Sequence, residues 1–189
     1  DRNLEKQAAY WKSQFEGEVP VLEMPLDHPR SSEQGHDGNF ISIQTNTDFM
    51  KSLENLSRKT GATEYMIFMA GLMVMLGKYS RQEDIVVGCP ISGRTHRDTE
   101  SMLGMFVNTL AMRGMPEKDK PFCDFLQEVK TTCLNGYEHQ DYPLEELLDK
   151  IDVVRDLARN PLFDVVLVLQ NNEETVYNFH DVKAEVSGI

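Results

Sequence analysis

The first quarter of the chain combines a helical spacing of apolar positions with one alternating stretch. Residues 3–16 carry apolar side chains at every third or fourth position, which predicts an amphipathic helix. The apolar positions of this helix are Leu4, Ala8, Trp11 and Phe15. A long polar loop follows over about residues 17–37, and residues 39–45 (NFISIQT) alternate as a strand does. We therefore expect a helix, a long loop and a strand, in this order.

Two further helices are expected before the middle of the chain. Asp48 is a suitable N-cap for the first of them, and Gly61 is a suitable stop. Thr63 caps the second, which runs to Tyr79 and is apolar on almost every side. Its apolar run is shorter than the ~20 residues that a membrane span requires, so the pattern indicates a buried central helix. We expect no membrane partner.

Apolar runs in the remainder of the chain predict strands that alternate with helices. Strands are expected at residues 84–91, 106–112 and 163–170, with an edge strand at 181–186, and helices at 122–137 and 143–151. The first and third of these strands are almost continuously apolar, as in strands covered on both faces. The predicted fold class is α/β (or α+β), with a mixed β-sheet flanked by helices.

The composition is that of an acidic globular protein. The 189 residues include 31 acidic and 19 basic side chains, for a formal net charge of −12. Hydrophobic residues make up 40% and charged residues 26%, a balance typical of folded rather than disordered chains. Binding to phosphates requires a basic face, so this charge argues against nucleic acid as a partner. The length suggests one domain, or one lobe of a larger unit.

The cysteines indicate the redox compartment of the protein, and the start of the chain indicates whether it is part of a longer polypeptide. Cys89, Cys123 and Cys133 are odd in number and have no CxxC spacing, so neither a disulfide framework nor a zinc site is expected. A reducing cytoplasm is the compartment that fits. The chain does not begin with Met and has no apolar signal segment near its start. We expect it to be a piece of a longer polypeptide.

Residues that commonly carry out catalysis are present without a catalytic pattern. The five histidines are scattered, and no two of them have the spacing of metal ligands. The sequence contains no GxSxG elbow, and Cys89 lies in a predicted buried strand, where a small inert side chain is expected. The glycines before Lys78 do not have the spacing of a phosphate loop. We therefore predict no catalytic residue and no metal ligand within this chain.

Three polar segments stand where packing alone does not require them. Asn108 and Thr109 interrupt an apolar strand, flanked by Gly104 and Arg113. A polar turn, His139-Gln140-Asp141-Tyr142-Pro143, joins two predicted helices, and Arg155, Asp156, Arg159 and Asn160 precede the third buried strand. Each segment taken alone has a structural explanation: hydrogen bonding at a strand end, a helix-capping turn and a structural ion pair, respectively.

Taken together and in this order, the segments resemble a family. Residues 103–110 (LGMFVNTL) with Arg113 resemble the fifth core motif of nonribosomal peptide synthetase condensation domains. Residues 139–145 (HQDYPLE) resemble the sixth motif and residues 155–162 (RDLARNPL) the seventh, while residues 90–94 (PISGR) match a segment that precedes the fifth. The resemblance covers essentially the whole chain. Leu144 departs from it, since the family usually has Phe there, which is a tolerated apolar change.

The catalytic signature of that family, HHxxxDG, does not occur in these 189 residues. The family resembles chloramphenicol acetyltransferase, with two similar lobes and a tunnel between them, and the signature belongs to the N-terminal lobe. The resemblance therefore implies that residues 1–189 are part of the C-terminal lobe of a condensation domain, without the last part of that lobe. The chain alone is expected to be inactive.

The resemblance also implies an activity for the complete domain. Condensation domains form peptide bonds between aminoacyl and peptidyl thioesters, which carrier proteins deliver on 4'-phosphopantetheine arms. The implied partners are the N-terminal lobe, upstream and downstream carrier proteins and an adjacent adenylation domain, with no cofactor bound directly by this chain. The implied product class is peptide antibiotics.

Roles for particular residues follow from the same resemblance. Asn108, Thr109 and Gly104 are expected to form part of the tunnel wall, where the amide of Asn108 would position a substrate carbonyl or the pantetheine arm. Arg94 is the expected partner of the Asp of the absent signature. A structural role is expected for Arg113, His139, Gln140 and Asp141. We also hypothesise that Arg155, Asp156, Arg159 and Asn160 form a buried hydrogen-bonded turn that places the third strand.

Three alternatives remain open from the sequence. The chain could be a non-catalytic lobe that only docks carrier proteins, a related epimerization or heterocyclization domain, or a standalone acyltransferase. The intact FVNT at residues 106–109 favours condensation over epimerization and heterocyclization. A standalone acyltransferase would need its own catalytic histidine, and none of the five lies in a matching motif. The sequence does not identify the amino acids that are joined.

Overall fold

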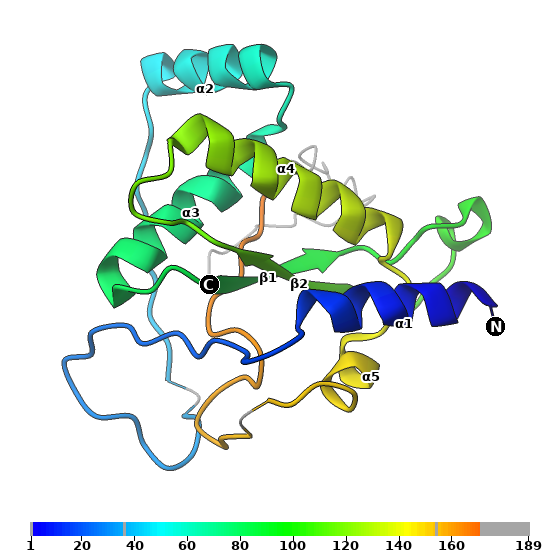
Figure 1. Ribbon diagram of the computed structural model, residues 1–189. Coiled ribbons are helices and arrows are strands. Elements are labelled where there is room, and N and C mark those ends of the chain that lie inside the picture. The colour runs from blue at the N-terminus through cyan, green and yellow to red at the C-terminus, as the bar shows by residue number, and fades with distance from the viewer. Residues whose placement is uncertain (1, 36, 154, 171–189) are drawn as a thin grey trace, which may run out of the picture.

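The computed structural model describes residues 2–35, 37–153 and 155–170, and the edge strand predicted at 181–186 lies outside these residues. The elements in chain order are α1 (Arg2–Gln14), α2 (Thr47–Thr60), α3 (Glu64–Ser80), β1 (Ile85–Ile91), η1 (Arg97–Thr99), β2 (Asn108–Gly114), α4 (Phe122–Glu138) and α5 (Leu144–Leu148). Figure 1 shows α3 and α4 above the two strands, α2 above that layer, and α1 and α5 on the other side of β2.

The sheet has an antiparallel pair at its centre and a parallel contact at its edge. Strand β1 pairs with β2 over the full length of both, with Gly88 opposite Ala111. On its other side, Gly88 donates its N–H to the carbonyl of Val165 (2.9 Å) and accepts from the N–H of Leu167 (3.0 Å). Antiparallel and parallel pairing together make this a mixed sheet, as predicted.

The third predicted strand is much shorter than expected. Within residues 163–170, the only strand pairing is the parallel bridge between Gly88 and Val166. Val166, Val168 and Leu169 are exposed by 47%, 58% and 42%, respectively, so the expectation of a buried strand is wrong for this part. A continuous apolar run indicates that a segment can be buried, but burial also requires neighbouring elements that cover both of its faces.

Helix α3 is the central buried helix that the sequence predicts. Met69 and Ala70 of this helix are fully buried, as are Leu126 and Cys133 of α4, and these side chains belong to one hydrophobic core above the sheet. Because α3 is apolar on most sides, it packs against α2, α4 and the strands at the same time. Within the described residues no single helix is long and apolar enough to cross a membrane, although α2 and α3 pass that test jointly across a bend of 101°.

The N-cap of α3 and the end of α2 agree with the sequence, whereas the start of α2 and the end of α5 do not, since the helix predicted at 143–151 spans only Leu144–Leu148. Thr63 caps α3 and Gly61 ends α2 with a left-handed φ of 64°, as predicted. The N-cap of α2 is Asn46, whose side chain accepts from the N–H of Phe49 (2.9 Å), and Asp48 lies inside the first turn. Both residue types are good N-caps, so the local pattern did not distinguish them. Strand β2 begins two residues later than predicted, at Asn108.

Residues 39–45 do not form the predicted strand. They form no strand pairing, and Phe40, Ile41 and Ile43 are exposed by 76%, 90% and 84%, respectively. An alternating pattern produces a strand only where another strand completes its hydrogen bonds, and the described residues provide none for this segment.

Substitutions at two glycines, Gly88 in β1 and Gly71 in α3, test the packing of Phe163 against β1. A Cβ on Gly88 would lie 2.6 Å from Cε2 of Phe163, whereas a Cβ on Gly71 in α3 would meet nothing within 4 Å. We expect Gly88→Ala to lower the free energy of unfolding by about 1–3 kcal/mol because Phe163 must move. The control Gly71→Ala should raise it by about 0.5–1 kcal/mol, since alanine is the better helix former.

Urea unfolding of the two variants and the parent protein measures both effects. Equal stability of Gly88→Ala and the parent would show that the packing of Phe163 against β1 does not constrain this position.

Candidate functional site

Two of the three polar segments singled out by the sequence, together with the PISGR segment, meet at one cavity beside the end of β1 and the start of β2. The cavity has a volume of about 340 Å³. Its lining comes from the end of β1, the start of β2 and the turn before α5, and comprises Gly93, Phe106, Val107, Asn108, Thr109, Asp141, Pro143, Leu144 and Glu145. Antiparallel pairing places Ile91 opposite Asn108, which brings the PISGR and FVNT segments together.

Asn108 connects β2 to the turn between α4 and α5. Its Nδ2 donates to the backbone carbonyls of Gln140 and Tyr142, both at 2.9 Å. Its Oδ1 accepts from the N–H of Thr109, also at 2.9 Å. The polar pair that interrupts the apolar strand therefore bonds to backbone 32 and 34 residues away, in addition to lining the cavity.

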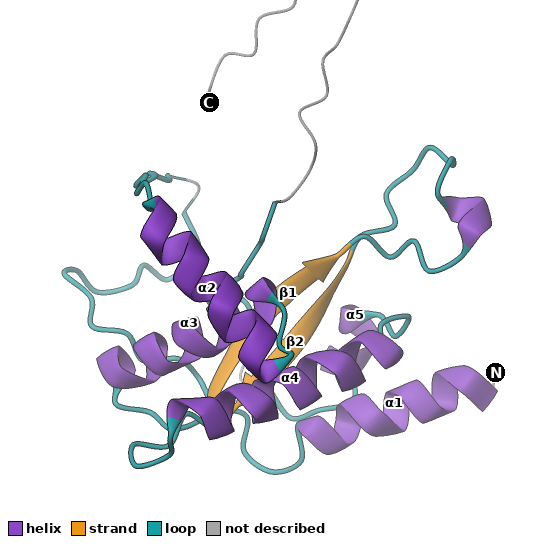
Figure 2. Ribbon diagram, turned by 90° about the horizontal axis from the view of Figure 1, so that it is seen from above, coloured by secondary structure: helices purple, strands orange, loops and turns teal. Residues whose placement is uncertain are grey.

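Two glycines shape the loop that joins β1 to β2. Gly93 has a φ of 64°, and a Cβ there would lie 1.7 Å from the carbonyl oxygen of Phe106, so only glycine fits this close backbone approach. Gly104 has a φ of 146° and lies under the ring of Phe106. Gly93 lines the cavity, whereas Gly104 lies in the loop that extends beyond the strands with η1 (Figure 2).

Arg94 holds that loop together. Its guanidinium donates to the backbone carbonyls of Thr99, Met102 (3.0 Å) and Gly104 (3.1 Å). It also lies over the ring of Phe106, 4.5 Å from the centroid, in a cation–π contact. Among the described residues no carboxylate pairs with Arg94, and the aspartate expected to do so belongs to the HHxxxDG signature, which does not occur in these 189 residues.

The polar turn at residues 139–143 packs against α1. The ring of His139 stacks on Tyr10 with centroids 4.1 Å apart, and its carbonyl accepts from Trp11 Nε1 at 2.7 Å. Gln140 donates from Nε2 to the carbonyl of Tyr137 (2.8 Å), and Asp141 accepts from the hydroxyl of Thr95 (3.1 Å). Of the three predicted residues in this turn, only Asp141 lines the cavity.

Arg113 lies at the far end of β2 from the cavity. It forms a bidentate pair with Asp84, with distances of 2.9 Å and 2.6 Å, and donates to the carbonyls of Gln14 (3.1 Å) and Glu18 (2.9 Å). This side chain joins β2, the start of β1 and the end of α1. Planar guanidinium geometry suits such a set of acceptors, which an ammonium group could not satisfy in the same way.

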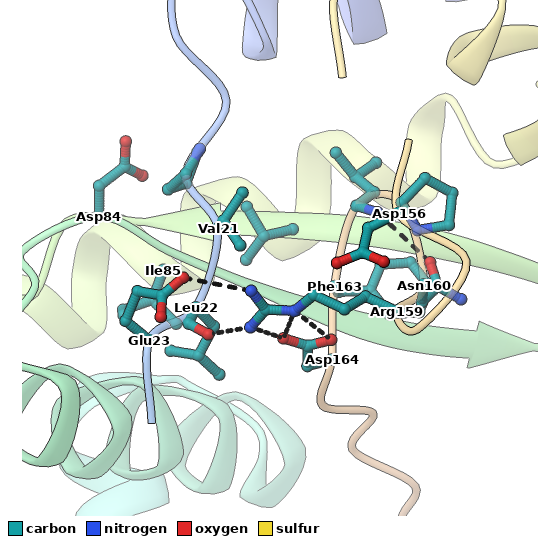
Figure 3. A pocket seen from close by; sticks show the side chains of 14 residues that line it. Val21, Leu22, Glu23, Asp84, Ile85, Asp156, Arg159, Asn160, Phe163 and Asp164 are labelled. Carbon is teal, nitrogen blue, oxygen red and sulfur yellow. Dashed lines mark hydrogen bonds and ion pairs between the residues drawn. The ribbon is translucent and has the colours of Figure 1, made fainter. Parts of the chain in front are cut away.

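Arg159 is the centre of a second cluster, shown in Figure 3. It pairs with Asp164 at 2.6 Å, with both side chains largely buried, and reaches Glu23 at 3.2 Å and the carbonyl of Leu22. These residues line a cavity of about 280 Å³ between the long N-terminal loop and residues 156–164. The same loop is held by Gln82, which bonds to the carbonyl of Val21 and the N–H of Glu23.

The predicted buried turn is only partly correct. Arg159 is largely buried, but Arg155, Asp156 and Asn160 are exposed. Arg155 pairs with Asp149 at 3.1 Å with both side chains more than 70% exposed, and Asp156 and Asn160 accept only from backbone N–H groups two residues ahead. Local turn bonds of this kind suit Asp and Asn in solvent, so burial was not required.

Burial keeps the thiols of Cys89 and Cys133 in an unreactive form. Burial is the main cause that raises the pKa of Cys89, and it raises the pKa of Cys133 to about 12, so both thiols stay protonated and poorly nucleophilic near neutral pH. In the described part of the chain, no group of three or more His, Cys, Asp or Glu side chains could hold a metal ion. The polar side chains described above line the cavity or hold its walls in place.

Sequence reasoning missed the partners of the two buried arginines and some cavity-lining residues. Asp84 precedes β1 and bonds to Arg113, and Asp164 lies at the start of the apolar run 163–170 and bonds to Arg159. Phe106 and Glu145 belong to the quoted motifs and line the cavity, but they were not named as site residues. The position of each aspartate at the start of an apolar run could have predicted a basic partner, since a charged side chain close to the core is usually paired.

Comparison with known proteins places this geometry in a family. The family model for the condensation domain matches residues 1–187. The chain is 51% identical over 177 residues to tyrocidine synthase 3 of Brevibacillus parabrevis and 45% identical over 186 residues to bacitracin synthase 3 of Bacillus licheniformis. These matches cover 94% and 98% of this chain, respectively, but only 3% of each synthase.

Solved structures show the same fold. A four-domain nonribosomal peptide synthetase bound to AMP and glycine superposes with a TM-score of 0.82 at 26% identity, over 87% of this chain and 12% of that one. The X-domain from teicoplanin biosynthesis superposes with a TM-score of 0.79 at 20% identity, over 86% of this chain and 36% of that one. The match over residues 1–187, the identity to the synthases and the shared fold agree, and the chain belongs to the condensation-domain family of the nonribosomal peptide synthetases.

Proposed function

We propose that this chain is part of the C-terminal lobe of a catalytic condensation domain and forms one wall of its substrate tunnel. The observation that carries the proposal is the convergence of the fifth and sixth family motifs, with Gly93 of the segment that precedes the fifth, on one cavity of about 340 Å³. Polar groups of Thr109, Asp141 and Glu145 and apolar groups of Val107 and Leu144 line it together. Such a mixed lining fits an arm made of amides and methylene groups, as in 4'-phosphopantetheine on a carrier protein.

The proposed reaction joins two carrier-bound substrates. The amine nitrogen of the acceptor bonds to the thioester carbonyl carbon of the donor, and the carbon–sulfur bond breaks. The proton lost from the nitrogen passes through a base to the departing thiolate. These 189 residues contain no HHxxxDG, so the base belongs to another segment of the domain, and this chain by itself is expected to form no product.

The proposal also includes the partners of the chain and its cellular compartment. The partners would be the N-terminal lobe, carrier proteins upstream and downstream, and a neighbouring adenylation domain, in the cytoplasm. The alternative is a lobe that only docks carrier proteins. The two differ in whether a domain that includes this chain transfers an acyl group at all.

The direct test is product formation by a domain that contains this chain together with a segment carrying HHxxxDG. Carrier proteins loaded with an aminoacyl donor and an aminoacyl acceptor are mixed with it, and carrier-bound dipeptide is measured by mass spectrometry. We expect dipeptide with the parent domain and none when the second His of the signature is replaced by Ala. Binding of both carriers without dipeptide, across a panel of loaded pairs, would instead support the docking alternative.

A second prediction concerns Arg94, which we propose to orient the catalytic loop through the aspartate of HHxxxDG. Arg94→Glu removes three hydrogen bonds to loop carbonyls and places a negative charge beside that aspartate. Misplacement of a catalytic group by about 1 Å can cost ~10²-fold in rate, and we expect a loss of that order in dipeptide formation.

Arg97→Glu is the matched control, because Arg97 lies in the same loop and is exposed. It should retain a rate near that of the parent. Equal rates for Arg94→Glu and the parent would rule out the orienting role.

A further inference from the structure

The carboxamide of Asn108 is almost fully occupied by backbone. Both of its N–H donors bond to carbonyls, those of Gln140 and Tyr142, and its oxygen accepts from the N–H of Thr109. A carboxamide has two donors and one oxygen with two lone pairs. A substrate carbonyl would need a donor, and both donors are already engaged at 2.9 Å.

The two carbonyls that Asn108 binds flank the start of a cavity wall. Gln140 and Tyr142 lie on either side of Asp141, and Tyr142 is followed by Pro143, the N-cap of α5. Helix α5 has five residues, and no side chain caps its N-terminus. So short a helix has little stability of its own and depends on tertiary contacts to keep its place.

Few other side-chain bonds hold this part of the turn to the strands. The hydroxyl of Thr95 donates to Asp141 at 3.1 Å, in an exposed position. Exposed hydrogen bonds of this kind compete with water and contribute little. Asn108 is half-buried, and its two bonds connect β2 to the segment that carries Pro143 and Leu144 into the cavity.

We infer that Asn108 is a positioning residue, which sets the distance between β2 and the cavity wall at residues 141–145 and does not itself bind substrate. This inference rests on the proposed function, because it assigns the cavity to the substrates of that reaction. The group that faces the substrate is then this wall, which includes Leu144, while Thr109 lines the cavity from β2. Loss of the two bonds would release the wall and widen the cavity.

The test uses Asn108→Asp in the complete domain. Aspartate keeps the size of the side chain but has no N–H donor, and its charge faces two carbonyl oxygens. Asn55→Asp in α2 is the control, since it makes the same chemical change at an exposed position whose partner, Arg58, can also bond to a carboxylate. Amide hydrogen exchange is measured across the domain, together with kcat and KM for dipeptide formation with a small and a bulky acceptor.

We expect exchange in residues 140–148 to become roughly tenfold faster or more in Asn108→Asp, while exchange in α3 and β1 stays unchanged. The ratio of kcat/KM for the bulky acceptor to that for the small one should rise, because a released wall admits the larger group. Thr95→Val alone should have a much smaller effect on both measurements, because the exposed bond that it removes contributes little.

Unchanged exchange in residues 140–148 would overturn the inference, whatever the activity. Faster exchange together with an unchanged ratio of kcat/KM for the bulky and small acceptors would overturn it too, because the wall would then not discriminate between acceptors by size. The exchange measurement does not depend on dipeptide formation, so a domain that forms no dipeptide refutes the proposed function and still reports whether Asn108 holds the turn.

Discussion

Strand β1 is bonded on both sides, and the rest of the described structure is arranged around this constraint. It pairs with β2 along its whole length, and on its other side Gly88 carries the two backbone bonds to Val165 and Leu167. The ring of Phe163 occupies the space that a Cβ of Gly88 would fill. Because the segment must come this close, the turn before it is anchored by the pair of Arg159 and Asp164, which in turn holds the long N-terminal loop at Leu22.

The same pairing brings the functional motifs together. The end of β1 continues into PISGR and the start of β2 follows from FVNT, so antiparallel register places both segments at one end of the sheet. The turn at residues 139–143 reaches that end because α4 runs back over the strands (Figure 1). Arg94 and Asn108 then fix the loop on one side of the cavity and the turn on the other.

Features set by neighbouring residues could be predicted, and features that need a distant partner could not. The cap at Thr63, the stop at Gly61 and the buried helix between Glu64 and Ser80 follow from local chemistry and from one long apolar run. Residues 39–45 and 163–170 carry equally clear strand patterns but lack strand pairing along most of their length, because pairing depends on a second segment. The site divides in the same way. The motifs were visible in the sequence, but the bonds from Asn108 to the carbonyl groups near residue 140 were not.

The position of α1 has a consequence for the behaviour of the molecule in solution. Since Gly88 directs its backbone bonds away from β2, its partner Ala111 directs its own away from β1, toward the side of β2 on which the described residues pair no further strand. An open edge of this kind can recruit strands from other molecules and start aggregation. Ala111 is only 2% exposed, because Trp11 of α1 packs over this part of β2 and Arg113 bonds to the last residue of that helix. Helix α1 therefore protects the sheet against edge-to-edge association, and a chain without this helix would expose backbone N–H and C=O groups of β2 that can pair with strands of other molecules.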